Sequence, residues 1–413
     1  MDHDRVYEPD ETFAPAELLR RCAEEYGTPV LVYSGRVLAE RQALIRRAFS
    51  WNPGYRQYFP VPVADELGLL RLICREGGGL ACSTRLHLLL AEKAGAKPDQ
   101  ILFRAVYPTE RDVETARALG CMEILNSLEQ LGFYRERGLV PRRVGLRFQP
   151  DEKISLRSRQ RTHAVPSRFG MTRQELLTAA ELLSREPLDE LGLYLQLSNN
   201  EAASGYLAAE SRILLELLPE VEQRAGRRVD WCDIGGGLAV PDRKRPEIDL
   251  TREAELVHNA FRETGREKLS LHTQFGRFLA GPAGILLTRV QWTRTGQRNI
   301  LGVDASLSDL PRSAMTGVDY HISLLGNSGL AGRWTCYVEG PTMEKMDRYG
   351  RQHVLPETRP GDILIFHDTG AFTRSMASNH GGRLRCPVVL LEGDEIRLIR
   401  RREMDEDYFR LFL

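Results

Sequence analysis

The feature that most constrains this chain is a long stretch, from about residue 37 to residue 280, in which short apolar runs alternate with amphipathic helical patterns. Strands that alternate with helices in this way form parallel sheets covered by helices. Eight strand candidates lie at 58–63, 78–83, 101–106, 122–126, 144–149, 192–197, 229–234 and 269–275. This number of units predicts a (β/α)8 TIM barrel, with a doubly wound open sheet as the alternative.

The pattern changes after about residue 281, where strand-like runs are broken by Gly, Pro and Asp and no long helix intervenes. Such runs predict an antiparallel β domain. An earlier apolar run at 28–35 precedes the barrel and is expected to join that sheet. We therefore expect a barrel domain over 37–280 and a β domain over 281–413 that also takes a strand from 1–36.

The charge balance excludes proteins that bind nucleic acid or membrane surfaces through excess positive charge, since Lys+Arg and Asp+Glu both number 57. No run approaches the roughly 18 apolar residues of a membrane span, and the acidic start "MDHDRVYEPDETF" lacks the apolar segment of a signal peptide. The seven cysteines include no C-x-x-C pair, and the sequence has no His-x-x-His or Cys/His cluster. We expect a cytoplasmic protein with reduced thiols and no metal.

Eight short motifs carry more specific information. In chain order they are "YGTPVLVYS", "VGLRFQP", "SRFGM", "DIGGGL", "QFGR", "VDASLSDLPR", "GPTMEKMD" and "GAFTRSMASNHGGRLR". Their order and content resemble the fold-type III pyridoxal-phosphate decarboxylases, the diaminopimelate, ornithine and arginine decarboxylase group, over roughly residues 25–404. The resemblance implies a barrel followed by a β domain. It also implies a homodimer in which the "GPTMEKMD" loop reaches the site of the partner subunit.

One departure from this family concerns its central residue. The family's first barrel strand ends in Y-A-V-K-A-N, whose lysine forms the Schiff base with pyridoxal phosphate. Here the matching run is "FPVPVA", and Pro62 stands at the lysine position. A ring nitrogen that belongs to the backbone cannot form an imine, so covalent capture of the aldehyde at this position is chemically excluded.

Other positions at which the family holds or tunes the cofactor also differ. The resemblance places a neutral amide, Gln274, opposite the pyridine nitrogen where the family has glutamate, and an amide cannot keep that nitrogen protonated. It places Gln196 where the family has a histidine stacked on the ring. The remaining replaced positions are Ala81, Asn199, Met343 and Phe372.

The residues that bind the cofactor phosphate in the family are retained. Backbone N–H groups of Gly235, Gly236 and Gly237, together with the guanidinium of Arg277, are expected to form an anion site. We extend the expected substrate-binding set to the retained or replaced positions Arg147, Gln196, Asn199, Gln274 and Asp304. We therefore expect a small anionic substrate and no cofactor, while non-covalent pyridoxal phosphate or another phosphorylated ligand stays open.

The candidate catalytic residues are Glu344 and Asp347, in the interface loop of the family, and His380, at a position where the family often has tyrosine. The alternative for the two carboxylates is a solvated loop, and for His380 a structural polar contact. Lys345 offers a relocated amine, or a solvent-facing side chain. Whether the chain is an enzyme stays open at this point.

Two functions fit these observations. One is a cofactor-independent decarboxylase-like enzyme of bacterial specialised, amino-acid-derived metabolism that uses the old pocket. The other is a non-catalytic paralogue that regulates or scaffolds an active decarboxylase. An active enzyme of the first kind needs a substrate that carries its own electron-accepting group, since the cofactor chemistry is absent.

Overall fold

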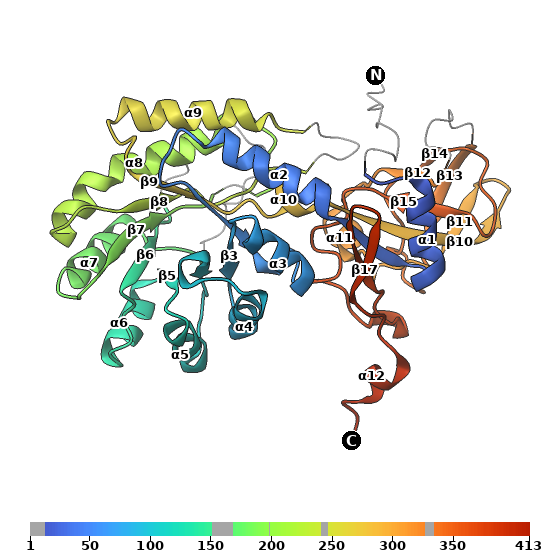
Figure 1. Ribbon diagram of the computed structural model, residues 1–413, viewed down its shortest axis with the longest axis horizontal. Helices are drawn as coiled ribbons and strands as arrows, with labels where there is room; N and C mark the ends of the chain where they lie inside the picture. The colour runs from blue at the N-terminus through green and yellow to red at the C-terminus, as the bar shows by residue number, and fades with distance from the viewer. Residues whose placement is uncertain (1–12, 151–167, 198, 241–246, 327–333) are drawn as a thin grey trace.

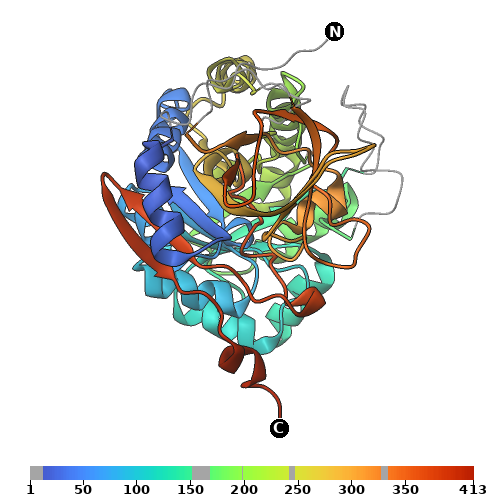
Figure 2. The same ribbon diagram turned by 90° about the vertical axis from the view of Figure 1, so that its right-hand side faces the viewer.

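The computed structural model describes residues 13–150, 168–197, 199–240, 247–326 and 334–413. It has two lobes, a barrel formed by the first part of the chain and a sheet formed mainly by the last part (Figure 1). Viewed from the sheet side, the barrel lies behind the sheet, and the N-terminal helix lies with the last strands (Figure 2). No helix among the described residues is long and apolar enough to cross a membrane.

The barrel predicted from the alternating pattern is confirmed. Parallel strands close on themselves in the order β2 to β9. They are β2 (Arg56–Pro60), β3 (Gly79–Cys82), β4 (Ile101–Phe103), β5 (Met122–Leu125), β6 (Arg143–Arg147), β7 (Glu190–Tyr194), β8 (Trp231–Asp233) and β9 (Ser270–Thr273). The open-sheet alternative is therefore wrong, because β2 also pairs with β9.

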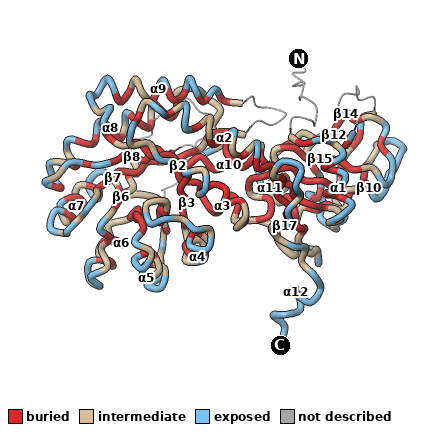
Figure 3. The backbone as a smooth tube through the Cα atoms, in the orientation of Figure 1, coloured by how far each residue is buried: buried red, intermediate tan, exposed pale blue. Residues whose placement is uncertain are grey.

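Helices surround the barrel and bury one apolar face each against it (Figure 3). They are α2 (Gly35–Ala48), α3 (Leu67–Arg75), α4 (Arg85–Ala94), α5 (Glu110–Ala118), α6 (Leu128–Glu136), α7 (Arg173–Leu183), α8 (Tyr206–Ala225) and α9 (Leu250–Glu263). Several begin at a hydroxyl residue whose side chain accepts the N–H of the first turn, as Thr109 does for Asp112 and Thr172 for Glu175. These caps set where the capped helices start after their strands.

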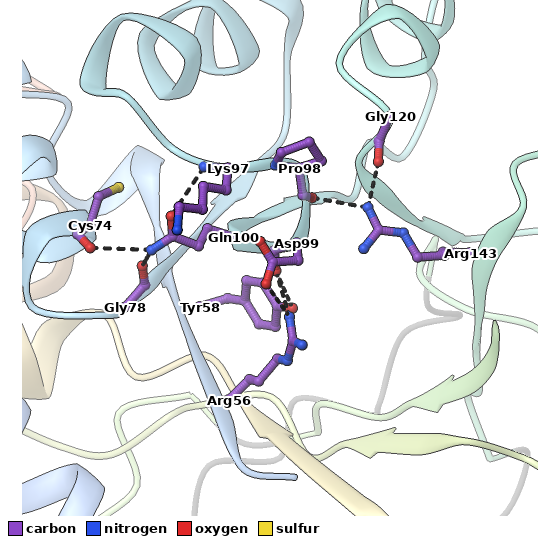
Figure 4. Close-up of polar contacts among 10 residues, drawn as sticks. All are labelled: Arg56, Tyr58, Cys74, Gly78, Lys97, Pro98, Asp99, Gln100, Gly120 and Arg143. Atoms are coloured by element: carbon purple, nitrogen blue, oxygen red, sulfur yellow. Dashed lines mark hydrogen bonds and ion pairs between the residues drawn. The ribbon is translucent and has the colours of Figure 1, made fainter. Parts of the chain in front are cut away.

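The short helix η3 (Pro98–Gln100) lies at the N-terminal end of the barrel, just before β4, and Figure 4 shows its polar contacts. The Gln100 amide donates to the carbonyl oxygens of Cys74 and Gly78, at 3.2 and 2.9 Å. The Asp99 carbonyl accepts from Arg56 at 2.9 Å and from the Tyr58 hydroxyl at 3.1 Å. This end is thus held by backbone contacts, and in TIM barrels the opposite, C-terminal end carries the functional groups.

In the described part of the chain, the second lobe is a nine-stranded sheet with the helices α1 (Ala16–Tyr26), α11 (Pro311–Thr316) and α12 (Asp405–Phe409) beside it. Its strands are β1 (Val30–Ser34), β10 (Gly284–Arg294), β11 (Ile300–Val303), β12 (Ile322–Leu324), β13 (Trp334–Glu339), β14 (His353–Leu355), β15 (Ile363–Phe366), β16 (Val388–Glu392) and β17 (Glu395–Arg400). The expected joining of the 28–35 strand is confirmed, since β1 pairs with β10 and with β16.

The sheet is mixed rather than purely antiparallel, which corrects the sequence expectation. The pairs β1–β16 and β11–β13 are parallel, and the other pairs are antiparallel. The reason is that β1 comes from the far end of the chain and inserts between strands that are not its sequence neighbours. Apolar runs separated by turn residues identify strands, but they do not specify which strands pair with each other.

Candidate ligand-binding site at the barrel mouth

The first barrel strand ends before Pro62, which corrects the strand expected at 58–63. Strand β2 stops at Pro60, and Val61–Val63 form the single 3₁₀ turn η2, with Pro62 inside it. Proline suits the start of a helical turn because it fixes φ and needs no N–H partner there. Pro62 is therefore not part of the strand, and its ring lines the cavity at the barrel mouth.

The turn is attached to the second lobe through one carbonyl group. The Val63 oxygen accepts the N–H of Phe372 at 2.7 Å and the hydroxyl of Ser375 at 3.2 Å. Phe372 adopts a left-handed backbone conformation with φ of 61°, which is uncommon for a residue with a side chain. This strained position at the mouth places the aromatic ring over the cavity described next.

A cavity at the C-terminal end of the barrel gathers most of the expected binding residues. Its lining comprises Pro60, Pro62, Val63, Arg104, Gln196, Asn199, Gly237, Leu238, Gln274, Phe275, Gly276, Arg277, Phe278 and Phe372. No lysine is present among these described lining residues. Lys153 and Lys244 lie outside the described residues. The structure thus brings together Pro62, Gln196, Asn199, Gly237, Gln274 and Arg277, as expected.

The floor beside this cavity is a buried acid, Asp233, at the end of β8. One carboxylate oxygen accepts the N–H of Gly235 at 2.7 Å, and the other accepts the Gln274 amide at 2.7 Å. Burial raises the pKa of Asp233 to about 6, and the hydrogen bonds from Gln274 and Gly235 oppose that rise. A glutamate at position 274 would face this carboxylate at hydrogen-bond distance, so the amide removes a like-charge contact.

The glycine loop has a packing reason as well as a binding one. A Cβ added at Gly236 would lie 2.2 Å from the carbonyl oxygen of Gln274, and one at Gly235 would lie 2.7 Å from the Gln196 Cβ. Gly235 also has a φ of 65°, which favours glycine. Because Gly235 donates its N–H to Asp233, only Gly236 and Gly237 keep amides for a ligand, and Gly237 lines the cavity.

Arg277 opens the short helix α10 (Arg277–Ala280) directly after β9 and lines the cavity. Its guanidinium donates to the side-chain oxygen of Asn199. A second, adjacent cavity shares Arg277 and is lined on its other side by Arg312, His321, His367 and Asp368, among others. The expected partnership of Arg277 with the glycine loop therefore has its geometric basis in a common cavity wall.

Gln196 and Arg147 meet around one aromatic ring. The Tyr194 hydroxyl donates to the Gln196 side-chain oxygen at 2.7 Å, and the Arg147 guanidinium lies over the same ring at 5.1 Å. Arg147 also lies 4.4 Å from the ring of Phe169 and donates to Asn126 at 3.4 Å. Burial lowers the pKa of Arg147, because the charged form loses its solvent shell.

Sequence reasoning missed Arg104, which follows β4 and points into the cavity. The run 101–106 was interpreted as one strand, which hid this residue, whereas the strand ends at Phe103. A signal was present, because a charged residue at the C-terminal end of a barrel strand is typical of a functional position.

The structure does not bring Asp304 or Asp347 to this cavity. Asp304 accepts from Thr28 at 2.5 Å and from Thr288 at 2.6 Å, which ties the chain before β1 to β10. Asp347 is buried and accepts N–H groups of Leu307 at 2.7 Å and Thr342 at 2.9 Å. The oxygens of both carboxylates already accept hydrogen bonds from protein groups, and this geometry indicates structural roles.

Glu344 and His380 do lie together, with Glu344 Oε1 3.2 Å from His380 Nε2. Both side chains are about half exposed, and neither lines the cavity. Lys345 on the same loop is exposed. Within one chain these residues form a surface pair, so any contribution to a site would be to that of a second subunit. Among the described residues no group of three or more His, Cys, Asp and Glu side chains could hold a metal ion.

Comparisons with known proteins agree with this architecture. Protein TabA of Pseudomonas amygdali pv. tabaci is 29% identical over 395 residues, which is 95% of this chain and 92% of that protein. Diaminopimelate decarboxylase of Neisseria meningitidis serogroup B is 29% identical over 391 residues, 93% of this chain and 92% of that protein.

Solved structures share the fold. The crystal structure of diaminopimelate decarboxylase from Helicobacter pylori complexed with L-lysine has a TM-score of 0.85 at 23% identity, over 95% of this chain and 98% of that chain. The enzyme from m. jannaschii in co-complex with L-lysine has a TM-score of 0.88 at 22% identity, over 95% and 94% of the two chains.

Residues 36–281 match the sequence family of the pyridoxal-binding domain of pyridoxal-dependent decarboxylases. The matched segment contains every barrel strand, and it ends just before the strand β10 of the second lobe. Because this match covers more than half of the chain, the protein belongs to the pyridoxal-dependent decarboxylase family.

Proposed function

We propose that this protein binds a small anionic ligand in the barrel mouth and acts on it without a covalently held pyridoxal phosphate. The observation that carries the proposal is Pro62, whose ring forms part of the cavity wall and which the motif resemblance aligns with the family's Schiff-base lysine. The proposed activity is that of a cofactor-independent lyase or decarboxylase-like enzyme of specialised metabolism.

The cavity fits one end of pyridoxal phosphate and not the other. Gly237 and Arg277 offer an amide and a cation to a phosphate. The aldehyde end meets Pro62, which has no amine, and the Gln274 amide already donates to Asp233. Gln274 Oε1 is buried without a hydrogen-bond partner, and a neutral oxygen cannot hold a pyridinium charge as a carboxylate does. We therefore derive no catalytic step through this cofactor.

The first prediction concerns covalent labelling. When the protein is mixed with pyridoxal phosphate and reduced with borohydride, peptide mapping should find no stoichiometric pyridoxyl-lysine. The physical reason is that the cavity offers no primary amine among its described lining residues. Specific labelling of Lys345, or of Lys153 or Lys244, would contradict the proposal and indicate a relocated lysine.

The second prediction is that Pro62→Lys does not restore decarboxylation. The variant can form an imine, visible as an aldimine absorbance band, but Gln274 and Gln196 still replace two groups that act with the lysine. Groups that act as a unit are strongly non-additive, so repair of one recovers little. Carbon dioxide release from lysine, ornithine, arginine or diaminopimelate should stay at background. Measurable turnover of any of the four would show that the other replacements are tolerated.

A second candidate function is a non-catalytic subunit that regulates an active decarboxylase. The observation that favours it is the loop 340–347, where Met343 is fully exposed and Met346 is 57% exposed beside Lys345. Exposed methionines are typical of contact surfaces. Light scattering on the purified protein would test the proposed homodimer. A complex with an intact decarboxylase, in place of a homodimer, would favour the regulatory function.

A further inference from the structure

The strongest unexplained feature of the barrel mouth is a pair of arginines that lack acidic partners. Arg104 lines the cavity with Pro60 and Pro62, and its backbone N–H donates to the Cys82 carbonyl at 2.8 Å. Its Nε atom is buried without a hydrogen-bond partner. Within the described part of the chain, no carboxylate forms an ion pair with the Arg104 guanidinium.

Arg147 lies two strands further on, at the end of β6, and is not among the residues that line the cavity. Its Nε atom is also buried without a partner, and its printed contacts are the Asn126 amide oxygen and two aromatic rings. The buried acid Asp233 interacts electrostatically with both arginines, but its two oxygens already accept from Gly235 and Gln274. Two buried or half-buried cations therefore face a single engaged carboxylate, an arrangement that costs free energy until an anion arrives.

The topology separates these cations from Arg277. In the closed ring of β2 to β9, strands β4 and β6 flank β5, and β5 stands diametrically opposite β9. Arg104 follows β4, Arg147 ends β6, and Arg277 follows β9. The strands that carry the positive charge thus lie on two opposite sides of the mouth, and Pro62 after β2 and Gln196 after β7 are neutral lining residues between them.

We infer that the natural ligand is a small dianion that spans the mouth, with a phosphate at Gly237 and Arg277 and a carboxylate at Arg104, supported by Arg147. This inference rests on the proposed anion site and specifies its substrate class. A phosphate held at Gly237 and Arg277 leaves the guanidinium of Arg104, on the other wall of the same cavity, for a second anionic group. Cationic amino acids, with an ammonium group directed at Arg104, are excluded by like-charge repulsion.

The test uses two pairs of phosphate esters that differ only in a carboxylate. Glycerol 3-phosphate is compared with 3-phosphoglycerate, and pyridoxine 5′-phosphate with 4-pyridoxic acid 5′-phosphate, by titration calorimetry. The distance between phosphate and carboxylate differs between the two acids, so the pairs test two separations of the anionic groups. In at least one pair the acid should bind roughly tenfold to hundredfold more tightly, as a charge-assisted contact predicts.

Two variants show which arginine causes the preference for the carboxylate-bearing ester. Arg104→Gln should bring the members of the pair to within about threefold of each other, whereas Arg277→Gln should weaken both members. Arg111→Gln, on the exposed face of α5, is the matched control and should change nothing. Thermal unfolding of each variant confirms that it is folded.

The outcomes separate the inference from the proposed function. If Arg277→Gln weakens every ester but the carboxylate brings no preference, or the preference survives in Arg104→Gln, the dianion inference is overturned and the anion site stands. If none of the four esters binds the unaltered protein, both fail.

Discussion

Replacing Gly192 with alanine is expected to destabilise the protein by about 3 kcal/mol, the upper end of the usual cost of overpacking a core. Gly192 lies on β7 inside the barrel, where an added Cβ would sit 2.2 Å from the Trp231 ring. Trp231 is 1% exposed and stacks on His272, with ring centroids 4.9 Å apart. A Cβ at Gly145 would meet the same indole at 2.4 Å, so the ring cannot shift toward that strand.

Urea unfolding of the variant would measure this loss as a lower transition midpoint at unchanged slope. Gly132→Ala on α6 is the matched control, because no atom lies within 4 Å of the added Cβ and alanine favours the helix. That control should be neutral or slightly stabilising. A Gly192→Ala midpoint equal to that of the unaltered protein would mean that the barrel interior has room that the structure does not show.

Replacing Glu123 with glutamine is expected to change how stability depends on pH. Glu123 lies on β5, is 1% exposed, and accepts the Tyr134 hydroxyl at 2.9 Å. Burial raises the pKa of this carboxyl from 4.5 to about 8. Between these values the unfolded chain releases the proton and the folded chain keeps it. Unfolding of the unaltered protein therefore becomes easier as pH rises.

Glutamine carries no such proton, so the variant should gain stability relative to the unaltered protein as pH rises from 5 to 8. The expected slope of this difference is about 1.4 kcal/mol per pH unit, and it flattens above the folded-state pKa. Denaturation midpoints across this range measure it, with Glu129→Gln on the exposed face of α6 as the control. Parallel pH curves for the two proteins would contradict a raised pKa at Glu123, whatever the absolute cost of the substitution.

The architecture could be predicted from the sequence because buried strands and half-buried helices each give apolar residues a characteristic spacing along the chain. Each expected barrel run contains or overlaps an observed strand, and the ends differ by up to three residues, as at 101–106, where the strand stops at Phe103. At Pro60 to Val63 the two prolines turn the end of an apolar run into a 3₁₀ turn. Periodicity alone cannot separate such a turn from the strand that it continues.

The candidate site could be predicted only in part, since motif position does not specify where a side chain finds its partners. Gln196, Gln274 and Arg277 share a cavity as expected. Asp304 instead accepts from the hydroxyl of Thr28, which is far away in sequence. Asp347 accepts from the hydroxyl of Thr342 in its own loop and from the backbone N–H of the distant Leu307. Arg104 was hidden because an arginine between apolar residues resembles a strand position until the strand end is known.

The position of β1 in the second sheet has a consequence for how the protein is made. Val30 pairs with Leu287 and Leu31 with Val388, so the earliest strand of the chain becomes an interior strand of the last sheet. On a ribosome, the whole barrel emerges while β1 still lacks both neighbours, and its second edge is filled only when β16 appears. Contacts so distant in sequence fold slowly and leave a strand edge open in the meantime. The barrel is thus the unit that can form first, and β1, although it is synthesised before the barrel strands, is among the last strands to find its neighbours.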